Sequence, residues 1–296
     1  MIEEIKITSL NGRGSVIIKS KDHEGYWLGP VDWGQVSGHH NTYSYYNQIG
    51  ESIVSTTLTS RPISITGWVI DSWTGSLQER CHFLNSFISP AEDYILEYKD
   101  KKINFRPDSS IIYSRKFKKN NEIIRQFFIQ GIAPYPLFTS IADQTSTFES
   151  SGKMFRFPTN FGRISPLVFA NIKKAYNIEI YNSGGFQTGL IANIKFSGIV
   201  VNPRIINLTT GKFIGVNRTF SEGERLEIST AIGNKYITLR TESGEEENLI
   251  KYRDFQMTWM QLEPGSNVLA LDCDKLDQRN NMEVIIKFTP LFLEVE

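Results

Sequence analysis

The sequence is poor in the patterns that most often mark catalysis or cofactor binding. Its 296 residues include two cysteines and four histidines. They contain no Walker A loop, no Gly-x-Ser-x-Gly elbow and no complete dinucleotide-binding glycine pattern. No repeat recurs at a fixed period. These absences remove the clearest signatures of nucleotide binding, of serine hydrolases and of solenoid folds, and we expect no cofactor.

The chain also lacks an excess of charge and a long apolar run. Lys plus Arg and Asp plus Glu number 32 each, so no bulk field attracts nucleic acid or an anionic membrane. No apolar run approaches the roughly 20 residues that span a bilayer, and Glu3 and Glu4 stand where a signal peptide carries positive charge. We therefore expect no membrane insertion, no specific nucleic-acid binding, and folding in a cytoplasm with Cys81 and Cys273 as separate thiols.

Strand patterning runs along almost the whole chain. Residues 204–216, RIINLTTGKFIGV, alternate in period two on both sides of Thr-Thr-Gly, which predicts a hairpin with Gly211 at its turn. A second, longer hairpin is predicted over 115–132, turning at Asn120 and Asn121. Many short β-branched or aromatic runs with Gly-rich turns indicate a mainly β protein.

One segment, residues 74–90, predicts a short helix among these strands. Ser76 and Glu79 have the spacing of a capping box, and Pro90 ends the segment. An apolar stripe follows at helical spacing, made by Leu77, Cys81, Leu84 and Ile88. We expect this helix to pack on the open face or mouth of a barrel or sandwich.

A shift in composition divides the chain into two halves. Residues 139–151, TSIADQTSTFESS, are mostly small and polar, as in a linker or an exposed hairpin. We place the boundary at about residue 140 and expect domains over 1–140 and 141–296. The strands of the second half, without a convincing helix, favour a β-sandwich or jelly roll.

The stretch 38–50, GHHNTYSYYNQIG, most resembles a binding site. His39 and His40 would point to opposite faces of a strand, where they cannot easily chelate one metal ion. Tyrosines are favoured at protein interfaces. We therefore favour an aromatic-rich loop or β-arm that packs on a partner over a metal site.

Two further charged patterns can each be interpreted either as ordinary surface turns or as a functional site. Asp272, Asp274 and Asp277 could hold calcium, although an acidic turn after a strand is the commoner arrangement. Glutamates beside Gly and Ser could supply the carboxylate pair of a glycoside hydrolase, although such residues sit best on solvated turns. They are Glu222, Glu224, Glu227, Glu242, Glu245, Glu246 and Glu247.

Aromatic side chains of the second half could bind sugar by stacking. Tyr252 and Trp259 are the candidates. The alternative for Trp259, which we favour, is a core aromatic on a strand.

The basic run 115–120 could touch phosphate, but it is more typical of a solvated hairpin tip.

Several motifs follow one another in a distinctive order. They lie in segments 196–216, 223–239 and 258–272 of the second half and in segments 61–70, 77–88 and 131–138 of the first half. The features are Asn202-Pro203 before a hairpin, Thr210-Gly211 at its turn, Gly223-Glu224 before the next strand, Leu262, and Pro264-Gly265-Ser266-Asn267. In these features the chain resembles the distal tail proteins of siphovirus-type phages.

This resemblance implies a fold and a role. It implies an N-terminal split β-barrel with one helix that forms a hexameric ring, and a galectin-like β-sandwich that projects outward. It implies no enzymatic activity and a place at the distal end of the tail of a virion. The implied partners are other copies of the chain, the tail tube protein, the tail-tip hub and, in some phages, receptor-binding proteins.

A closed ring needs a heterologous interface that favours aromatics and free strand edges. We expect two arms, the stretch 41–49 and the hairpin 115–128, to reach a neighbouring copy. The predicted interface residues are Tyr43, Tyr45, Tyr46, Arg115, Phe117 and Phe127. Two other functions stay open, a carbohydrate-binding module acting through the second half and a β-rich hydrolase.

Overall fold

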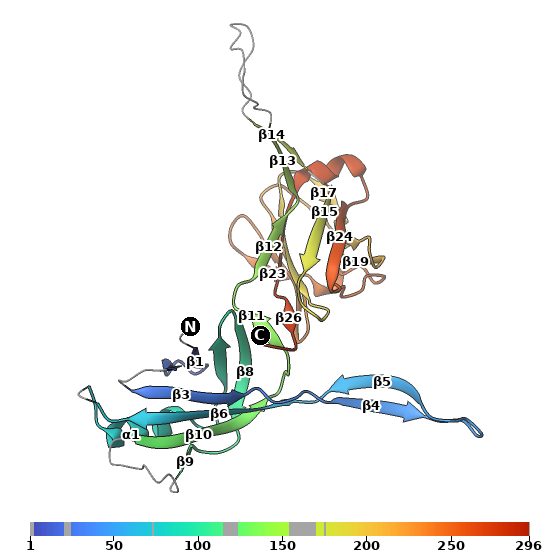
Figure 1. Cartoon of the computed structure of the whole chain (residues 1–296). Coiled ribbons are helices and arrows are strands. Elements are labelled where there is room, and N and C mark those ends of the chain that lie inside the picture. The colour runs from blue at the N-terminus through green and yellow to red at the C-terminus, as the bar shows by residue number, and fades with distance from the viewer. Residues whose placement is uncertain are drawn as a thin grey trace, which may run out of the picture. The chain divides into compact units, whose positions relative to one another are not determined.

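The protein consists of two compact units that are built almost entirely from β-strands (Figure 1). Unit 1 comprises Met1–Ile141 with Phe292–Glu296, and unit 2 comprises Ala142–Leu291. The computed structural model describes residues 3–20, 25–72, 74–114, 124–153, 170–174 and 176–295. The expected mainly β fold class is confirmed.

Unit 1 contains one α-helix, α1 (Leu77–Phe87), within its described residues. The C-terminal residues return to this unit and contribute its last strand, β26. The strands are β1 (Glu4–Ser9), β2 (Ser15–Lys19), β3 (Tyr26–Asp32), β4 (Gly38–Tyr43), β5 (Ser52–Leu58), β6 (Arg61–Ile70), β7 (Tyr94–Tyr98), β8 (Lys101–Pro107), β9 (Ile112–Tyr113), β10 (Ile124–Ala133), β11 (Phe138–Ser140) and β26 (Leu291–Phe292).

Most of these strands close into a barrel. The order β8-β7-β1-β2-β3-β6-β10 returns to its start, because β10 also pairs with β8 through Gly131 opposite Pro107 and Ile132 opposite Arg106. Alternate residues of each strand face inward, as in β1, where Ile5 and Ile7 are fully buried. Closure satisfies the edges of the sheet and encloses the core of unit 1.

Two glycines make this closure sterically possible. A Cβ at Gly131 would lie 2.2 Å from the carbonyl oxygen of Arg106, at the point where β10 meets β8. A Cβ at Gly67 would lie 2.4 Å from Cζ of Phe127, which is directly opposite it in the pairing of β6 and β10. Phe127 therefore lays its ring over a strand position that has no side chain.

The predicted helix is confirmed as α1, together with its capping box. The Ser76 hydroxyl accepts a hydrogen bond from the backbone N–H of Glu79, and the Glu79 carboxylate accepts one from the N–H of Ser76. The stripe Leu77, Cys81 and Leu84 is buried in the same cluster as the barrel core. The helix thus covers apolar barrel residues, as expected.

Unit 2 carries the remaining strands and two short 3₁₀ helices. The strands are β12 (Gln144–Thr147), β13 (Glu149–Lys153), β14 (Ala170–Lys174), β15 (Asn177–Asn182), β16 (Leu190–Phe196), β17 (Val200–Val201), β18 (Arg204–Asn207), β19 (Lys212–Gly215), β20 (Thr219–Phe220), β21 (Arg225–Ala231), β22 (Asn234–Arg240), β23 (Glu246–Asn248), β24 (Gly265–Asp272) and β25 (Met282–Phe288). The 3₁₀ helices are η1 (Ile250–Tyr252) and η2 (Leu276–Asn281).

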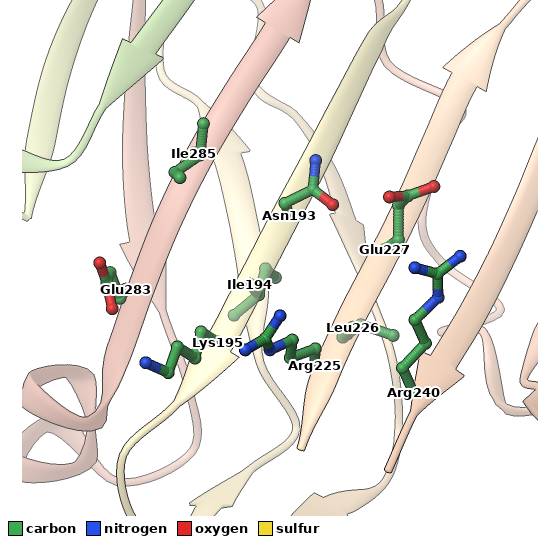
Figure 2. Close-up of a pocket in the computed structure, with 9 residues that line it drawn as sticks. All are labelled: Asn193, Ile194, Lys195, Arg225, Leu226, Glu227, Arg240, Glu283 and Ile285. Carbon is green, nitrogen blue, oxygen red and sulfur yellow. The ribbon is translucent and has the colours of Figure 1, made fainter. Parts of the chain in front are cut away.

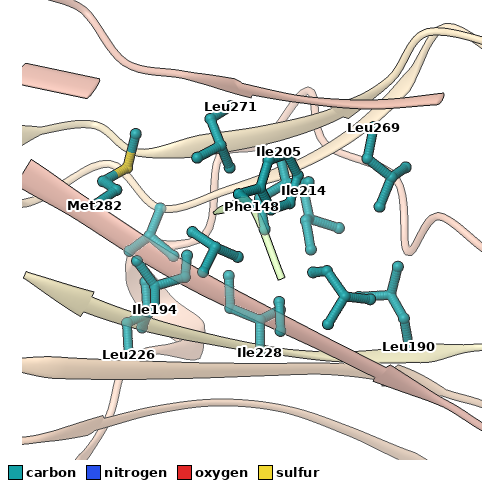
Figure 3. Packing of buried hydrophobic residues seen from close by; sticks show 14 of the residues in the cluster. Phe148, Leu190, Ile194, Ile205, Ile214, Leu226, Ile228, Leu269, Leu271 and Met282 are labelled. Carbon is teal, nitrogen blue, oxygen red and sulfur yellow. The ribbon is translucent and has the colours of Figure 1, made fainter. Parts of the chain in front are cut away.

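Ten of these strands form a β-sandwich, as predicted. A six-stranded sheet, β12-β25-β16-β21-β22-β23, packs against a four-stranded sheet, β15-β24-β18-β19. Figure 3 shows Ile194 and Leu226 of the first sheet reaching toward Ile205 and Leu271 of the second. The apolar residues that alternate along each strand therefore supply a core shared by both sheets.

The predicted hairpin over 204–216 is confirmed as β18 and β19. Its register pairs Arg204 with Gly215 and Asn207 with Lys212. Gly211 has a φ of 70°, in the left-handed region that glycine adopts without steric cost. The second predicted hairpin is seen as far as β9 and β10, where Tyr113 pairs with Phe127, and its turn lies outside the described residues.

Candidate assembly surface

The stretch with two histidines and three tyrosines lies in a two-stranded arm. Strands β4 and β5 pair only with each other among the described residues, and in Figure 1 they extend away from the strands of the barrel. Every residue of β4 and six of the seven residues of β5 are exposed, and Ser52 is half-buried. An isolated two-stranded hairpin is at best marginally stable in water, so this arm is a candidate for burial in an assembly.

The tip of the arm gathers exposed aromatic and aliphatic side chains. Tyr43 and Tyr45 pack edge to face with ring centroids 5.0 Å apart, and Tyr46 is 96% exposed. Ile49 and Ile53 are also exposed. Such a patch on a free chain is typical of a surface that another protein covers.

Gln48 gives the tip a defined loop conformation. Its side-chain oxygen accepts a hydrogen bond from the backbone N–H of Tyr45 at 3.0 Å, and its own N–H donates to the Tyr45 carbonyl at 3.0 Å. Its side-chain amide donates to the hydroxyl of Ser52 at 3.0 Å. The tyrosines are therefore presented by an internally hydrogen-bonded loop, which reduces the ordering cost of binding.

The base of the arm is fixed by a buried arginine at the first position of β6. Arg61 is 4% exposed, and its Nη1 donates hydrogen bonds to the carbonyl oxygens of Trp33, at 3.0 Å, and of Gly34, at 3.3 Å. Trp33 and Gly34 follow β3 on the way to β4. Arg61 thus joins the two chain segments that lead into and out of the arm.

The predicted interface residues have different positions. Tyr43, Tyr45 and Tyr46 are exposed on the arm. Phe127 has no exposed surface and fills the barrel core, so its inclusion as an interface residue is corrected: β10 turns Phe127 inward and leaves Phe128 half-buried on the other face. Arg115 and Phe117, with the basic run 115–120, lie outside the described residues.

The two histidines of the arm do not converge. Successive strand residues face opposite sides, and Nδ1 of His40 lies 2.8 Å from the hydroxyl of Thr56 on β5. Over the residues that the structure describes, no group of three or more His, Cys, Asp or Glu side chains could hold a metal ion. In the same part of the chain, no helix has the length and apolar character needed to cross a bilayer.

Several acidic residues of unit 2 are engaged with an arginine or a tyrosine. Asp272 pairs with Arg279 at 2.6 Å, and Asp274 pairs with Arg204 at 3.3 Å. Glu227 accepts a hydrogen bond from the hydroxyl of Tyr236 at 2.5 Å. Asp277 begins η2. These contacts give the carboxylates structural partners, whereas a calcium site would need several of them to face one point.

The two cysteines are free and buried in different units. Cys81 lies in the barrel cluster and Cys273 in the sandwich cluster. Burial raises the pKa of both thiols above its usual value. Thiols with raised pKa values are poor nucleophiles at neutral pH, so both act as small apolar core residues.

The two aromatics predicted as sugar-stacking residues differ in exposure and surroundings. Trp259 is half-buried, packs against the sandwich core, and has Nζ of Lys235 5.7 Å from its ring centroid. Tyr252 is more exposed, with Nζ of Lys251 4.9 Å and the guanidinium of Arg218 5.8 Å from its ring centroid. Cations therefore already lie over both rings, and sugar stacking stays a prediction.

Sequence reasoning missed two contributors to this surface, Arg61 and Ile53. Arg61 gave no signal, because an arginine before a proline at a strand start says nothing about burial. Ile53 gave a weak signal, because Ile49 and Ile53 are apolar residues in an otherwise polar segment beside the tyrosines. Together with the tyrosines they define the apolar tip of the arm.

Comparison with known proteins gives a family-model match for part of the chain and a shared fold for most of it. Residues 183–292 match the family model of the siphovirus-type tail component, C-terminal domain. A crystal structure of the Dit protein of phage SPP1, described as a paradigm of the hub adsorption apparatus in phages that infect Gram-positive bacteria, matches with a TM-score of 0.64 and 14% identity, over 98% of this chain and 99% of that chain. The phage P2 baseplate in its activated conformation with calcium matches with a TM-score of 0.50 and 12% identity, over all of both chains. The search of curated protein sequences found no match.

Proposed function

We propose that the chain is a structural distal tail protein without enzymatic activity, because residues 183–292 match the family model of the siphovirus-type tail component, C-terminal domain. In this proposal unit 1 builds a closed ring, most simply of six copies, at the distal end of a phage tail or of a related tail-like particle. Unit 2 is the galectin-like domain of each copy.

The observation that carries the proposal is the exposed arm on a chain whose whole length has the fold of the SPP1 Dit protein. A ring needs one surface of each copy to bind a different surface of the next. The arm has two outer strand edges whose backbone groups can pair with a strand of another copy. It also has an apolar tip that is exposed in the single chain. A permanent contact of this kind buries more than about 1,500 Å².

The partners follow from the position of such a ring. One face joins the tail tube protein and the other joins the tail-tip hub, with receptor-binding proteins attached in some phages. The protein's place is then the distal end of the virion tail. The support for these partners is the likeness to proteins described as hub and baseplate components.

The test is the size of the assembly formed by the full chain. We expect multi-angle light scattering and negative-stain electron microscopy to show a ring. The double change Tyr45→Ser and Tyr46→Ser removes two exposed rings without touching the core, and we expect it to shift the population toward single chains. A ring that persists unchanged in this variant contradicts the role of the arm.

A matched control separates the arm from a general loss of apolar surface. Leu208, in the turn between β18 and β19, is 53% exposed, and Leu208→Ser should leave the assembly intact. A wild-type chain that stays monomeric across a wide concentration range, alone and with its tail partners, contradicts the ring itself.

A further inference from the structure

The outer face of the six-stranded sheet carries a depression of about 310 Å³. It lies over β25, β16, β21 and β22, and its outward-facing lining is polar and charged apart from Ile285 (Figure 2). The lining residues that point away from the core are Asn193, Lys195, Arg225, Glu227, Arg240, Glu283 and Ile285. This volume is at the lower end of the range for small-ligand sites.

Three cations stand in one row across this face. Lys195 of β16 is paired in register with Arg225 of β21, and Arg225 is paired with Arg240 of β22. Directly opposed residues on neighbouring strands have Cβ atoms about 5 Å apart, and like charges in such pairs destabilise a sheet. The arrangement therefore opposes folding unless a negative charge offsets it.

The chain places a glutamate at each end of the row but none in its middle. Arg240 forms an ion pair of 2.8 Å with Glu246 of β23. Glu283 of β25 is in register with Lys195, but within the described part of the chain neither Lys195 nor Arg225 forms an ion pair at 4.0 Å or less. Arg225, in the middle of the row, thus has a cation on each side.

A second row beside the cations supplies hydrogen-bonding groups. Asn193 and Glu227 are directly opposed, two residues along their strands from Lys195 and Arg225, which is about 7 Å at the usual rise per strand residue. Glu227 is held by the hydroxyl of Tyr236 at 2.5 Å. Burial, and next the hydrogen bond to Glu227, raise the pKa of Tyr236 to about 12, so this tyrosine keeps its proton and continues to position the carboxylate.

We propose that this depression binds an anionic sugar or polyol, a ligand that carries a phosphate or carboxylate next to free hydroxyl groups. The anionic group lies against Lys195 and Arg225, where it relieves their repulsion. The hydroxyls hydrogen-bond to the Asn193 amide and to the Glu227 carboxylate. A neutral sugar would leave the repulsion around Arg225 in place, so the charge row is what selects the ligand. The site belongs to unit 2 and does not depend on ring assembly.

The test is a titration of the full chain with small probes, in which saturation-transfer NMR measures the binding of each probe. The charged probes are glycerol 3-phosphate and glucuronate, and their neutral counterparts are glycerol and glucose. We expect the charged probes to bind with a dissociation constant on the order of millimolar, the neutral probes to bind at least about tenfold more weakly, and the affinity for the charged probes to fall as salt is added.

Variants assign the binding to this face. Arg225→Ala should lower the affinity for both charged probes at least about tenfold. Lys212→Ala, an exposed cation on β19 of the other sheet, should change nothing. Glu227→Gln tests the second row and should reduce the preference for glycerol 3-phosphate over inorganic phosphate. Thermal unfolding of each variant confirms that its fold is retained.

Three outcomes overturn the proposal. They are binding of glucose as tight as that of glucuronate, unchanged binding in a folded Arg225→Ala variant, and no saturation transfer from any probe. Equal affinity for inorganic phosphate and glycerol 3-phosphate overturns its second half, because the hydroxyl contacts would then contribute nothing. All of these results can be obtained whether or not the chain forms a ring.

Discussion

The guanidinium of Arg61 donates a hydrogen bond from Nε to the carbonyl oxygen of Pro136 at 2.8 Å. Its Nη2 donates to the carbonyl oxygen of Leu293 at 2.5 Å, and its Cζ lies 4.8 Å from the ring centroid of Phe138. One buried cation thus joins the base of the arm to the segment before β11 and to the C-terminal segment after β26.

The change Arg61→Ala should destabilise unit 1 and loosen the base of the arm. It leaves four carbonyl oxygens without their donor, and an unsatisfied buried acceptor costs about 1–3 kcal/mol. We expect the free energy of unfolding to fall by about 3 kcal/mol or more, together with faster amide exchange at Trp33 and Gly34. Urea unfolding and hydrogen–deuterium exchange measure the two effects.

Two comparisons make this prediction specific. Arg61→Lys keeps the charge but cannot supply the planar set of donors, so it should recover only part of the stability. Arg106→Ala breaks an exposed ion pair with Asp93 and should cost less than about 1 kcal/mol. Equal losses in Arg61→Ala and Arg106→Ala would show that the buried contacts of Arg61 contribute nothing beyond surface charge.

The change Gly67→Ala should destabilise the barrel because the new methyl group collides with the ring of Phe127. The 2.4 Å separation expected between that Cβ and Cζ of Phe127 is far below a normal contact, and overpacking of a core costs about 1–3 kcal/mol. Thermal unfolding measures the loss. Gly185→Ala is the matched control, since no atom lies within 4 Å of a Cβ built at Gly185; equal effects of the two changes would refute the steric explanation.

Local patterns in the sequence predict local structure well. The hairpin β18–β19 and the helix α1 are both encoded within about a dozen neighbouring residues, through period-two alternation with a glycine turn and through a capping box with an apolar stripe. The exposed strand arm is partly encoded in the same way, because polar residues and tyrosines alternate without an apolar face.

Relationships between distant strands could not be predicted in the same way. Phe127 and Phe128 are adjacent, and alternation alone does not say which of the two faces the core; the contact with Gly67 on β6 decides it. The row of Lys195, Arg225 and Arg240 depends on the register of three strands. A shift of one residue in that register would turn each side chain to the other face, and no local pattern fixes it.

The change Asn267→Ala should destabilise unit 2 because it opens a buried polar network. Asn267 has no exposed surface; its Nδ2 donates to the carbonyl oxygen of Glu263 at 2.7 Å, and its Oδ1 accepts hydrogen bonds from Nδ2 of Asn207 at 3.1 Å and from the N–H of Glu263 at 3.0 Å. We expect a loss of about 2–3 kcal/mol in the free energy of unfolding, measured in urea.

An isosteric variant separates the network from the packing. Asn267→Asp keeps the shape and the acceptor but removes the donor to the Glu263 carbonyl and buries a charge, so it should be at least as destabilising as the alanine variant at neutral pH. If Asn267→Asp were as stable as the wild type, hydrogen bonding at this site would contribute little.

The stability of unit 1 should fall in alkaline solution because of Tyr26. Burial is the main cause that raises the pKa of Tyr26 to about 12, against 10.0 for an unperturbed tyrosine. The unfolded chain therefore loses this proton at lower pH than the folded chain, and the contribution of Tyr26 is complete below pH 10.0 and lost between pH 10.0 and about 12. The pKa of the neighbouring Tyr113 is raised as well, chiefly by burial, so the contribution of Tyr113 to the free energy of unfolding also falls as the pH rises.

Urea unfolding at a series of alkaline pH values measures this effect. The free energy of unfolding should fall more steeply with pH for the wild type than for Tyr26→Phe. Parallel curves would mean that the phenol of Tyr26 ionises equally easily in the folded and unfolded states.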